Sequence, residues 1–102
     1  MGISITSLAY VLPGQKNTNA ERAERFGSET VAKIESISGI LERRTAKGDT
    51  CASDLAVRAA RLIFENSKIS PKDIDLLIFA TQTPDYLIPT TACIIQQRLG
   101  ID

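Results

Sequence analysis

The apolar run Leu76-Leu77-Ile78-Phe79-Ala80 decides the fold class of this chain. It has no polar residue on either face, which is typical of an interior parallel strand covered by helices on both sides. Apolar side chains recur at helical spacing before the run, in residues 52–67, and after it, in a helix that starts at Thr90 or Thr91. Residues 3–12 are the one good candidate for a partner strand. This order of strands and helices predicts an α/β layered fold.

The predicted sheet is too thin to be complete. A strand that is apolar on both faces needs a neighbouring strand at each edge, and the sequence offers only residues 3–12. The chain ends at Ile101-Asp102, just past a helix, where the next strand is expected. We therefore expect residues 1–102 to be one incomplete domain, a piece of a larger α/β protein.

Local signals predict the remaining elements. The expected elements are a short charged helix at residues 20–26 closed by Gly27, a helix from Ser28 to the turn at Ser38-Gly39, an extended stretch at residues 40–46, and a single helical turn around Ser70-Pro71. For the long helix of residues 52–67, the cap candidates are Asp49, Thr50 and Ser53. Its apolar face is expected to contain Leu55, Ala59, Leu62 and Ile63.

Charge and composition exclude several classes of function. Twelve basic residues balance twelve acidic ones, the isoelectric point is about 6.2, and no run of Lys or Arg is present. Electrostatic binding to nucleic acid or to an anionic membrane is therefore not expected. The apolar run at residues 76–80 is far shorter than the roughly 20 residues that cross a bilayer. No export signal opens the chain, so we expect a cytoplasmic protein whose two cysteines are reduced.

The absence of histidine limits the chemistry that these residues can perform. Without imidazole the chain can form neither a Ser-His nor a Cys-His couple, and it lacks the commonest metal ligand. We therefore expect no metal site, no cofactor and no catalytic residue in residues 1–102. Cys93 stands among the apolar residues Ala92, Ile94 and Ile95, which favours packing as a small hydrophobe over a nucleophilic role.

The loop of residues 81–89 is the first candidate for a functional site. It follows the carboxyl end of the buried strand, where ligand sites of open α/β sheets gather. Leu87 and Ile88 are adjacent apolar residues between turn formers, so they need a subunit surface or an apolar ligand as a partner. An ordinary strand-to-helix loop shaped by its prolines remains the alternative. The cluster Glu42-Arg43-Arg44 could receive a phosphate or carboxylate, although such clusters are usually solvated faces.

Several of these stretches together resemble a known family. They are Ser38-Gly39-Ile40-Leu41-Glu42-Arg43-Arg44, the long helix of residues 52–67, and above all residues 80–93 (ATQTPDYLIPTTAC) with Leu99-Gly100-Ile101. The chain resembles the start of a β-ketoacyl-acyl-carrier-protein synthase III over its whole length. The resemblance implies the thiolase fold, in which two similar α/β halves are stacked in layers. Residues 1–102 would form only the first part of the N-terminal half.

The resemblance also implies an activity that residues 1–102 cannot perform alone. Members of the family condense an acyl thioester with malonyl-acyl-carrier protein by decarboxylative Claisen chemistry in fatty acid biosynthesis. Their catalytic Cys, His and Asn would lie beyond Asp102, so this chain alone is expected to be inactive as an acyltransferase. The implied partners are acyl-carrier protein, an acyl-coenzyme A or acyl-carrier-protein thioester, and a second subunit in a homodimer.

The implied substrate-binding residues are Leu87, Ile88, Ser38 and Gly39, with Ile88 similar to the residue that reaches into the partner subunit's acyl tunnel. Lys33 and Ile37 stand where many members hold the adenine of coenzyme A with Trp and Arg. A relative in secondary metabolism that takes its acyl group from a carrier protein is therefore an alternative. So is a non-catalytic α/β interaction module, which gel filtration and the residues after Asp102 would distinguish.

Overall fold

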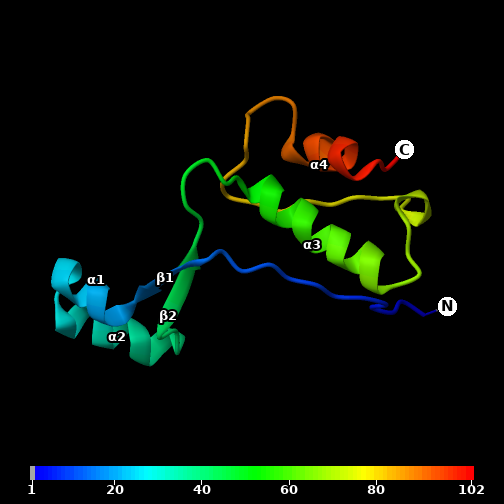
Figure 1. Ribbon diagram of the computed structural model, residues 1–102. Helices are drawn as coiled ribbons and strands as arrows, with labels where there is room; N and C mark the ends of the chain where they lie inside the picture. Colours follow the sequence, from blue (N-terminus) through cyan, green and yellow to red (C-terminus); the bar gives the residue numbers. More distant parts are fainter. Residues whose placement is uncertain (1) are drawn as a thin grey trace. The chain divides into compact units, whose positions relative to one another are not determined.

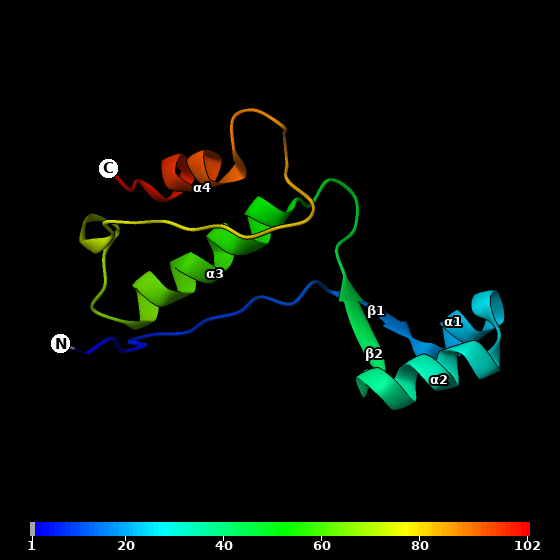
Figure 2. The same ribbon diagram turned by 180° about the vertical axis from the view of Figure 1, so that it is seen from behind.

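The computed structural model describes residues 2–102, which divide into two compact units. One unit combines residues 2–11 with Asp49–Asp102, and the other is Leu12–Gly48. Figures 1 and 2 show the elements of each unit from opposite sides. Among the described residues, every helix is too short or too polar to span a bilayer.

The unit Leu12–Gly48 is built on a two-stranded antiparallel ladder. Strand β1 (Gln15–Thr18) pairs with strand β2 (Glu42–Thr45), in a register that places Gln15 opposite Thr45. Helices α1 (Asn19–Phe26) and α2 (Ser28–Ser38) connect the strands and pack against each other. Both helices and the extended stretch that becomes β2 confirm the sequence prediction, whereas β1 was not expected.

Local caps explain where these helices begin and end. The Thr18 N–H donates to the Glu21 carboxylate at 2.7 Å, and the Glu21 N–H donates to Thr18 Oγ1 at 3.3 Å, which forms a capping box at the start of α1. Helix α2 ends at Gly39, whose φ of 67° is the left-handed conformation that glycine adopts without strain. The residues next to each cap therefore explain where α1 begins and where α2 ends.

The other unit contains helix α3 (Ala52–Asn66), the 3₁₀ turn η1 (Pro71–Asp73) and helix α4 (Thr91–Leu99). Helices α3 and α4 pack against each other (Figure 1), and Val57 and Ile95 are the buried apolar residues of this unit. The predicted face of α3 is partly wrong, because Leu62 is exposed and the buried line runs through Ser53 and Val57. The predicted caps are wrong as well. The N-cap is Cys51, whose N–H donates to the Asp54 carboxylate at 2.8 Å.

The two predicted central strands are extended but unpaired in the described chain. Residues 3–12 and 76–80 carry no strand assignment, and the only strand pair among residues 2–102 is β1 with β2. Leu76 and Ile78 are consequently exposed, as are the apolar residues at the start of the chain. The physical reason is that a strand exists only through hydrogen bonds to a neighbouring strand, and no stretch among residues 2–102 provides one.

Candidate functional site

The candidate site is centred on the loop of residues 81–90, which connects the extended run to α4. Its tip carries Tyr86, Leu87 and Ile88, and all three side chains are exposed. Leu87 is 92% exposed and Ile88 is 89% exposed, so within residues 2–102 nothing covers either side chain. The structure therefore places Leu87 and Ile88 on an accessible apolar tip, and their role in substrate binding stays a prediction.

Asp85, at the base of this loop, forms hydrogen bonds to both α3 and α4. Its N–H donates to Thr91 Oγ1 at 3.1 Å, at the first turn of α4. Its carboxylate accepts a hydrogen bond from the Ser53 hydroxyl and one from the Ser53 N–H at 3.4 Å, at the first turn of α3. Ser53 is 1% exposed and Thr91 is 4% exposed, and these are the buried polar residues of the described chain.

Arg98 completes this polar cluster from the last turn of α4. Its Nη1 donates to Ser53 Oγ at 3.1 Å and lies 2.8 Å from Asp54 Oδ1. The pKa of Asp54 is lowered, first by the hydrogen bond from the Cys51 N–H and then by the bond from Arg98. Both side chains of the ion pair are about a third exposed, so solvent screens their attraction.

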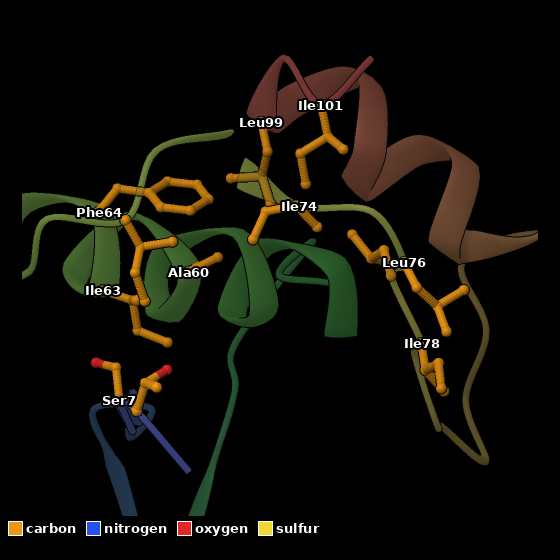
Figure 3. Close-up of a pocket in the computed structure, with 12 residues that line it drawn as sticks. Ser7, Ala60, Ile63, Phe64, Ile74, Leu76, Ile78, Leu99 and Ile101 are labelled. Atoms are coloured by element: carbon orange, nitrogen blue, oxygen red, sulfur yellow. The ribbon is translucent and has the colours of Figure 1, made fainter. Parts of the chain in front are cut away.

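Two apolar hollows flank these elements in the same unit. One, of about 450 Å³, lies beside the loop and is lined by Leu77, Ile78, Phe79, Thr81, Pro84, Tyr86, Leu87, Thr90, Thr91 and Ala92. The other, of about 310 Å³, is shown in Figure 3, where Phe64 of α3 lies on the side of Leu99 and Ile63 lies toward Ser7. Its lining holds no charged side chain, so it fits apolar groups.

Ser38 and Gly39, the other predicted binding residues, lie in the unit Leu12–Gly48. Gly39 ends α2 and donates its N–H to the Glu35 carbonyl at 2.7 Å, and Ser38 Oγ accepts the Ile40 N–H at 3.3 Å. Both residues therefore shape the turn after α2. Their predicted role in substrate binding stays a prediction.

The charge cluster Glu42-Arg43-Arg44 separates into two parts. Glu42 accepts ion pairs from Lys16 at 3.2 Å and from Arg44 at 3.9 Å. Arg43 instead lines a hollow of about 230 Å³ together with Arg22, Phe26 and residues of α2. The pairing of Glu42 with two cations favours a solvated surface whose charges neutralise each other over a site for a phosphate or carboxylate.

Both cysteines are unpaired, as predicted, but Cys93 is exposed rather than packed. The prediction of a buried Cys93 is wrong because α4 turns Ile95, and not Cys93, toward α3. The pKa of the Cys51 thiol is raised, first by desolvation and then by the nearby carboxylates of Asp85 and Asp54. Among residues 2–102, no group of His, Cys, Asp or Glu side chains is arranged to hold a metal ion.

Sequence reasoning missed the cluster of Ser53, Asp85, Thr91 and Arg98. Asp85 belongs to the loop that was singled out, and Ser53 was considered as a cap of its own helix. The pairing of these two residues across 32 positions has no local signal in the sequence. Only the packing of α3 on α4 brings them together.

No protein-family model matches the chain. The chain is 41% identical to a β-ketoacyl-[acyl-carrier-protein] synthase III of Helicobacter pylori strain G27, over 97% of its length. It is 39% identical to the enzyme of the same name from Syntrophomonas wolfei, over 98% of its length. The chain spans about 30% of the length of these curated relatives.

The fold of this chain also matches parts of several solved condensing-enzyme structures. A crystal structure of 3-oxoacyl-(acyl-carrier-protein) synthase III matches 97% of this chain with a TM-score of 0.82 and 40% identity, and the chain covers 29% of it. OleA from Xanthomonas campestris matches 97% of this chain, with a TM-score of 0.80 and 34% identity, and the chain covers 31% of it. The tetronic acid condensing enzyme AbyA1 matches 94% of this chain, with a TM-score of 0.74 and 32% identity, and the chain covers 31% of it.

These comparisons confirm two predictions from the sequence. The resemblance to β-ketoacyl-acyl-carrier-protein synthase III holds over nearly the whole chain, in sequence and in structure. The fold class is that of the thiolase-like condensing enzymes, of which the chain corresponds to about 30%.

Proposed function

We propose that residues 1–102 are part of a 3-oxoacyl-acyl-carrier-protein synthase III that condenses an acyl thioester with malonyl-acyl-carrier protein in fatty acid biosynthesis. The observation that carries the proposal is the 41% identity over 97% of the chain, joined to a structural match with a TM-score of 0.82. Agreement of sequence and backbone over one continuous stretch supports common descent more strongly than a shared fold alone.

The part played by residues 1–102 in this reaction is structural. Condensation needs an activated thiolate to take the acyl group and donors that stabilise the thioester oxyanion. The chain has no histidine to act on a thiol, and the pKa of Cys51 is raised, which opposes thiolate formation. In this proposal the catalytic Cys, His and Asn come from beyond Asp102. Residues 1–102 contribute scaffold and the loop of residues 81–90.

The exposed tip at Leu87 and Ile88 supports a role in an apolar interface. Two adjacent aliphatic side chains that are about nine-tenths exposed each bring an apolar surface that water solvates unfavourably. In this proposal they pack across a homodimer interface, and Ile88 forms part of the acyl pocket of the partner subunit. A cytoplasmic location and acyl-carrier protein as the partner belong to the same proposal.

A second candidate is a condensing enzyme of secondary metabolism that takes its acyl group from a carrier protein. Lys33 and Ile37 are exposed on α2 and offer no aromatic ring for stacking an adenine. The structural similarity to the tetronic acid condensing enzyme AbyA1, with a TM-score of 0.74, supports this candidate as well. The two candidates differ in acyl donor and share the decarboxylative chemistry.

The test is a condensation assay of the complete protein with malonyl-acyl-carrier protein and a series of acyl donors. Each acyl group is offered both on coenzyme A and on the carrier protein, and the β-ketoacyl product is measured by mass spectrometry. Preference for coenzyme A donors supports the first candidate, and turnover only with carrier-protein donors supports the second. Residues 1–102 alone serve as the inactive control. If no donor yields product and the complete protein is a monomer on gel filtration, the non-catalytic interaction module is the better description.

A further inference from the structure

We infer that Asp85 is a positioning residue that holds the loop of residues 81–90 in one conformation and thereby sets where Ile88 enters the acyl pocket. The role in acyl selection rests on the function proposed above. The anchoring of the loop rests only on the geometry around Asp85.

The first anchor is the carboxylate of Asp85 at the start of α3. The N-cap of this helix is Cys51, which supplies no side-chain oxygen to the first helical N–H groups. The Asp85 carboxylate supplies such an oxygen from outside the helix. It accepts the Ser53 N–H at 3.4 Å and also the Ser53 hydroxyl. A negative charge at a helix N-terminus is favoured by the unpaired N–H groups and by the helix dipole.

The second anchor is the main chain of the same residue. The Asp85 N–H donates to Thr91 Oγ1 at 3.1 Å, so the residue before the tip is bonded to the first residue of α4. The five residues 86–90 are therefore closed into a short loop whose two ends meet. Leu87 and Ile88 lie at the exposed centre of that loop.

Arg98 fixes the direction of the Ser53 hydroxyl. Its Nη1 donates to Ser53 Oγ at 3.1 Å, so the oxygen acts as acceptor toward Arg98 and its own proton is directed to Asp85. Ser53 is 1% exposed, so water has little access to its end of these bonds, whereas Asp85 is half-buried and Arg98 is exposed. The anchor of the loop is thus built from buried groups on both helices, whereas its tip is solvent-exposed.

A tip held in one conformation needs no ordering when it enters an apolar pocket. Pre-organisation of this kind sharpens the selection of acyl-chain length. An Ile88 side chain held in one position cannot move to accommodate a longer or shorter acyl chain. We therefore expect loss of the Asp85 anchor to blur the acyl-chain profile rather than to abolish the reaction. This separates a positioning role from a general structural one.

The experiment compares Asp85→Ala and Asp85→Asn in the complete protein, with Asp75→Asn as the matched control. Asp75 is exposed and forms no hydrogen bond or ion pair among residues 2–102. Hydrogen exchange at the amide of residue 85 reports loop opening, and kcat/KM for short and long acyl thioesters reports selection. We expect Asp85→Ala to speed exchange about tenfold and to reduce the preference among chain lengths. Asp85→Asn, which keeps one acceptor oxygen for Ser53, should recover part of both effects.

The anchoring is overturned if amide 85 exchanges in Asp85→Ala as slowly as in Asp75→Asn. The role in selection is overturned if exchange rises while the chain-length profile of the active variant stays that of the wild type. If the wild type turns over no thioester, the proposed function fails, but the exchange data still decide whether Asp85 anchors the loop. Should Asp85→Ala not fold, Thr91→Val breaks the second anchor, and Thr91→Ser is its conservative partner.

Discussion

Replacing Thr91 by Val tests whether one hydroxyl at the base of the loop contributes to stability. The change keeps the size and branching of the side chain and removes only the oxygen that accepts the Asp85 N–H at 3.1 Å. A net contribution of about 1 kcal/mol is typical of such a bond, and a fully buried orphaned donor costs up to about 3 kcal/mol. Thr91 is 4% exposed but Asp85 is only half-buried, so water partly replaces the lost acceptor. We expect a loss of about 1 kcal/mol in the free energy of unfolding.

The assay is urea denaturation of the purified complete protein, followed by circular dichroism at 222 nm. Thr81→Val is the matched control, since Thr81 Oγ1 accepts the Thr83 N–H at 3.0 Å in an exposed part of the same loop. Its effect should stay within about 0.5 kcal/mol. Thr91→Ser retains the acceptor and should lose less stability than Thr91→Val.

Equal losses in Thr81→Val and Thr91→Val would refute the reasoning, because burial would then make no difference to the value of the bond. A loss in Thr91→Ser as large as that in Thr91→Val would also refute it. In that case the methyl group of Thr91, and not its hydroxyl, would be the stabilising part.

Val57, Asp54, Cys51 and Ile88 each test a separate feature of the molecule. Val57→Ala should lower the free energy of unfolding by about 2 kcal/mol in urea denaturation, because two carbons and their contacts leave a site that is 1% exposed. The lowered pKa of Asp54 stabilises the folded state above the ordinary carboxyl pKa, so the advantage of the wild type over Asp54→Asn should shrink as the pH falls through and below about 4 in denaturation series. Because its pKa is raised, Cys51 should react with iodoacetamide at pH 8 more slowly than an unstructured peptide thiol, as measured by mass spectrometry on a Cys93→Ser background. In the complete protein, Ile88→Phe should reduce turnover of long acyl donors before short ones, and an unchanged chain-length profile in a dimeric variant would count against a pocket role.

The ends of α1, α2 and α4 have local causes, whereas Cys51, the N-cap of α3, was not among the predicted caps. Thr18 with Glu21 forms a capping box three residues apart, and Gly39 and Gly100 stand where left-handed residues end α2 and α4. Each of these signals lies within one helical turn of the end that it determines. No tertiary contact was needed to place them.

The polar cluster at the site could not be predicted in the same way. Asp85 and Ser53 are 32 positions apart, and each has an ordinary local reading as a turn residue and as a helix cap. The exposure of Cys93 was misjudged for a related reason. Its apolar neighbours Ile94 and Ile95 point in different directions on a helix, so neighbours in sequence do not report what a side chain faces.

Residues 3–12 and 76–80 are predicted as strands, but neither segment is paired in the described chain. The run at residues 76–80 is apolar on both faces, a pattern that only helices and neighbouring strands together satisfy. In residues 2–102 its backbone has no strand partner, and Leu76 and Ile78 are 75% and 82% exposed. The relatives that match this run are more than three times as long as the chain, since it covers 30% of them. The exposed run therefore has the character of a sheet edge, and its unpaired N–H and C=O groups are the template on which a further strand would add.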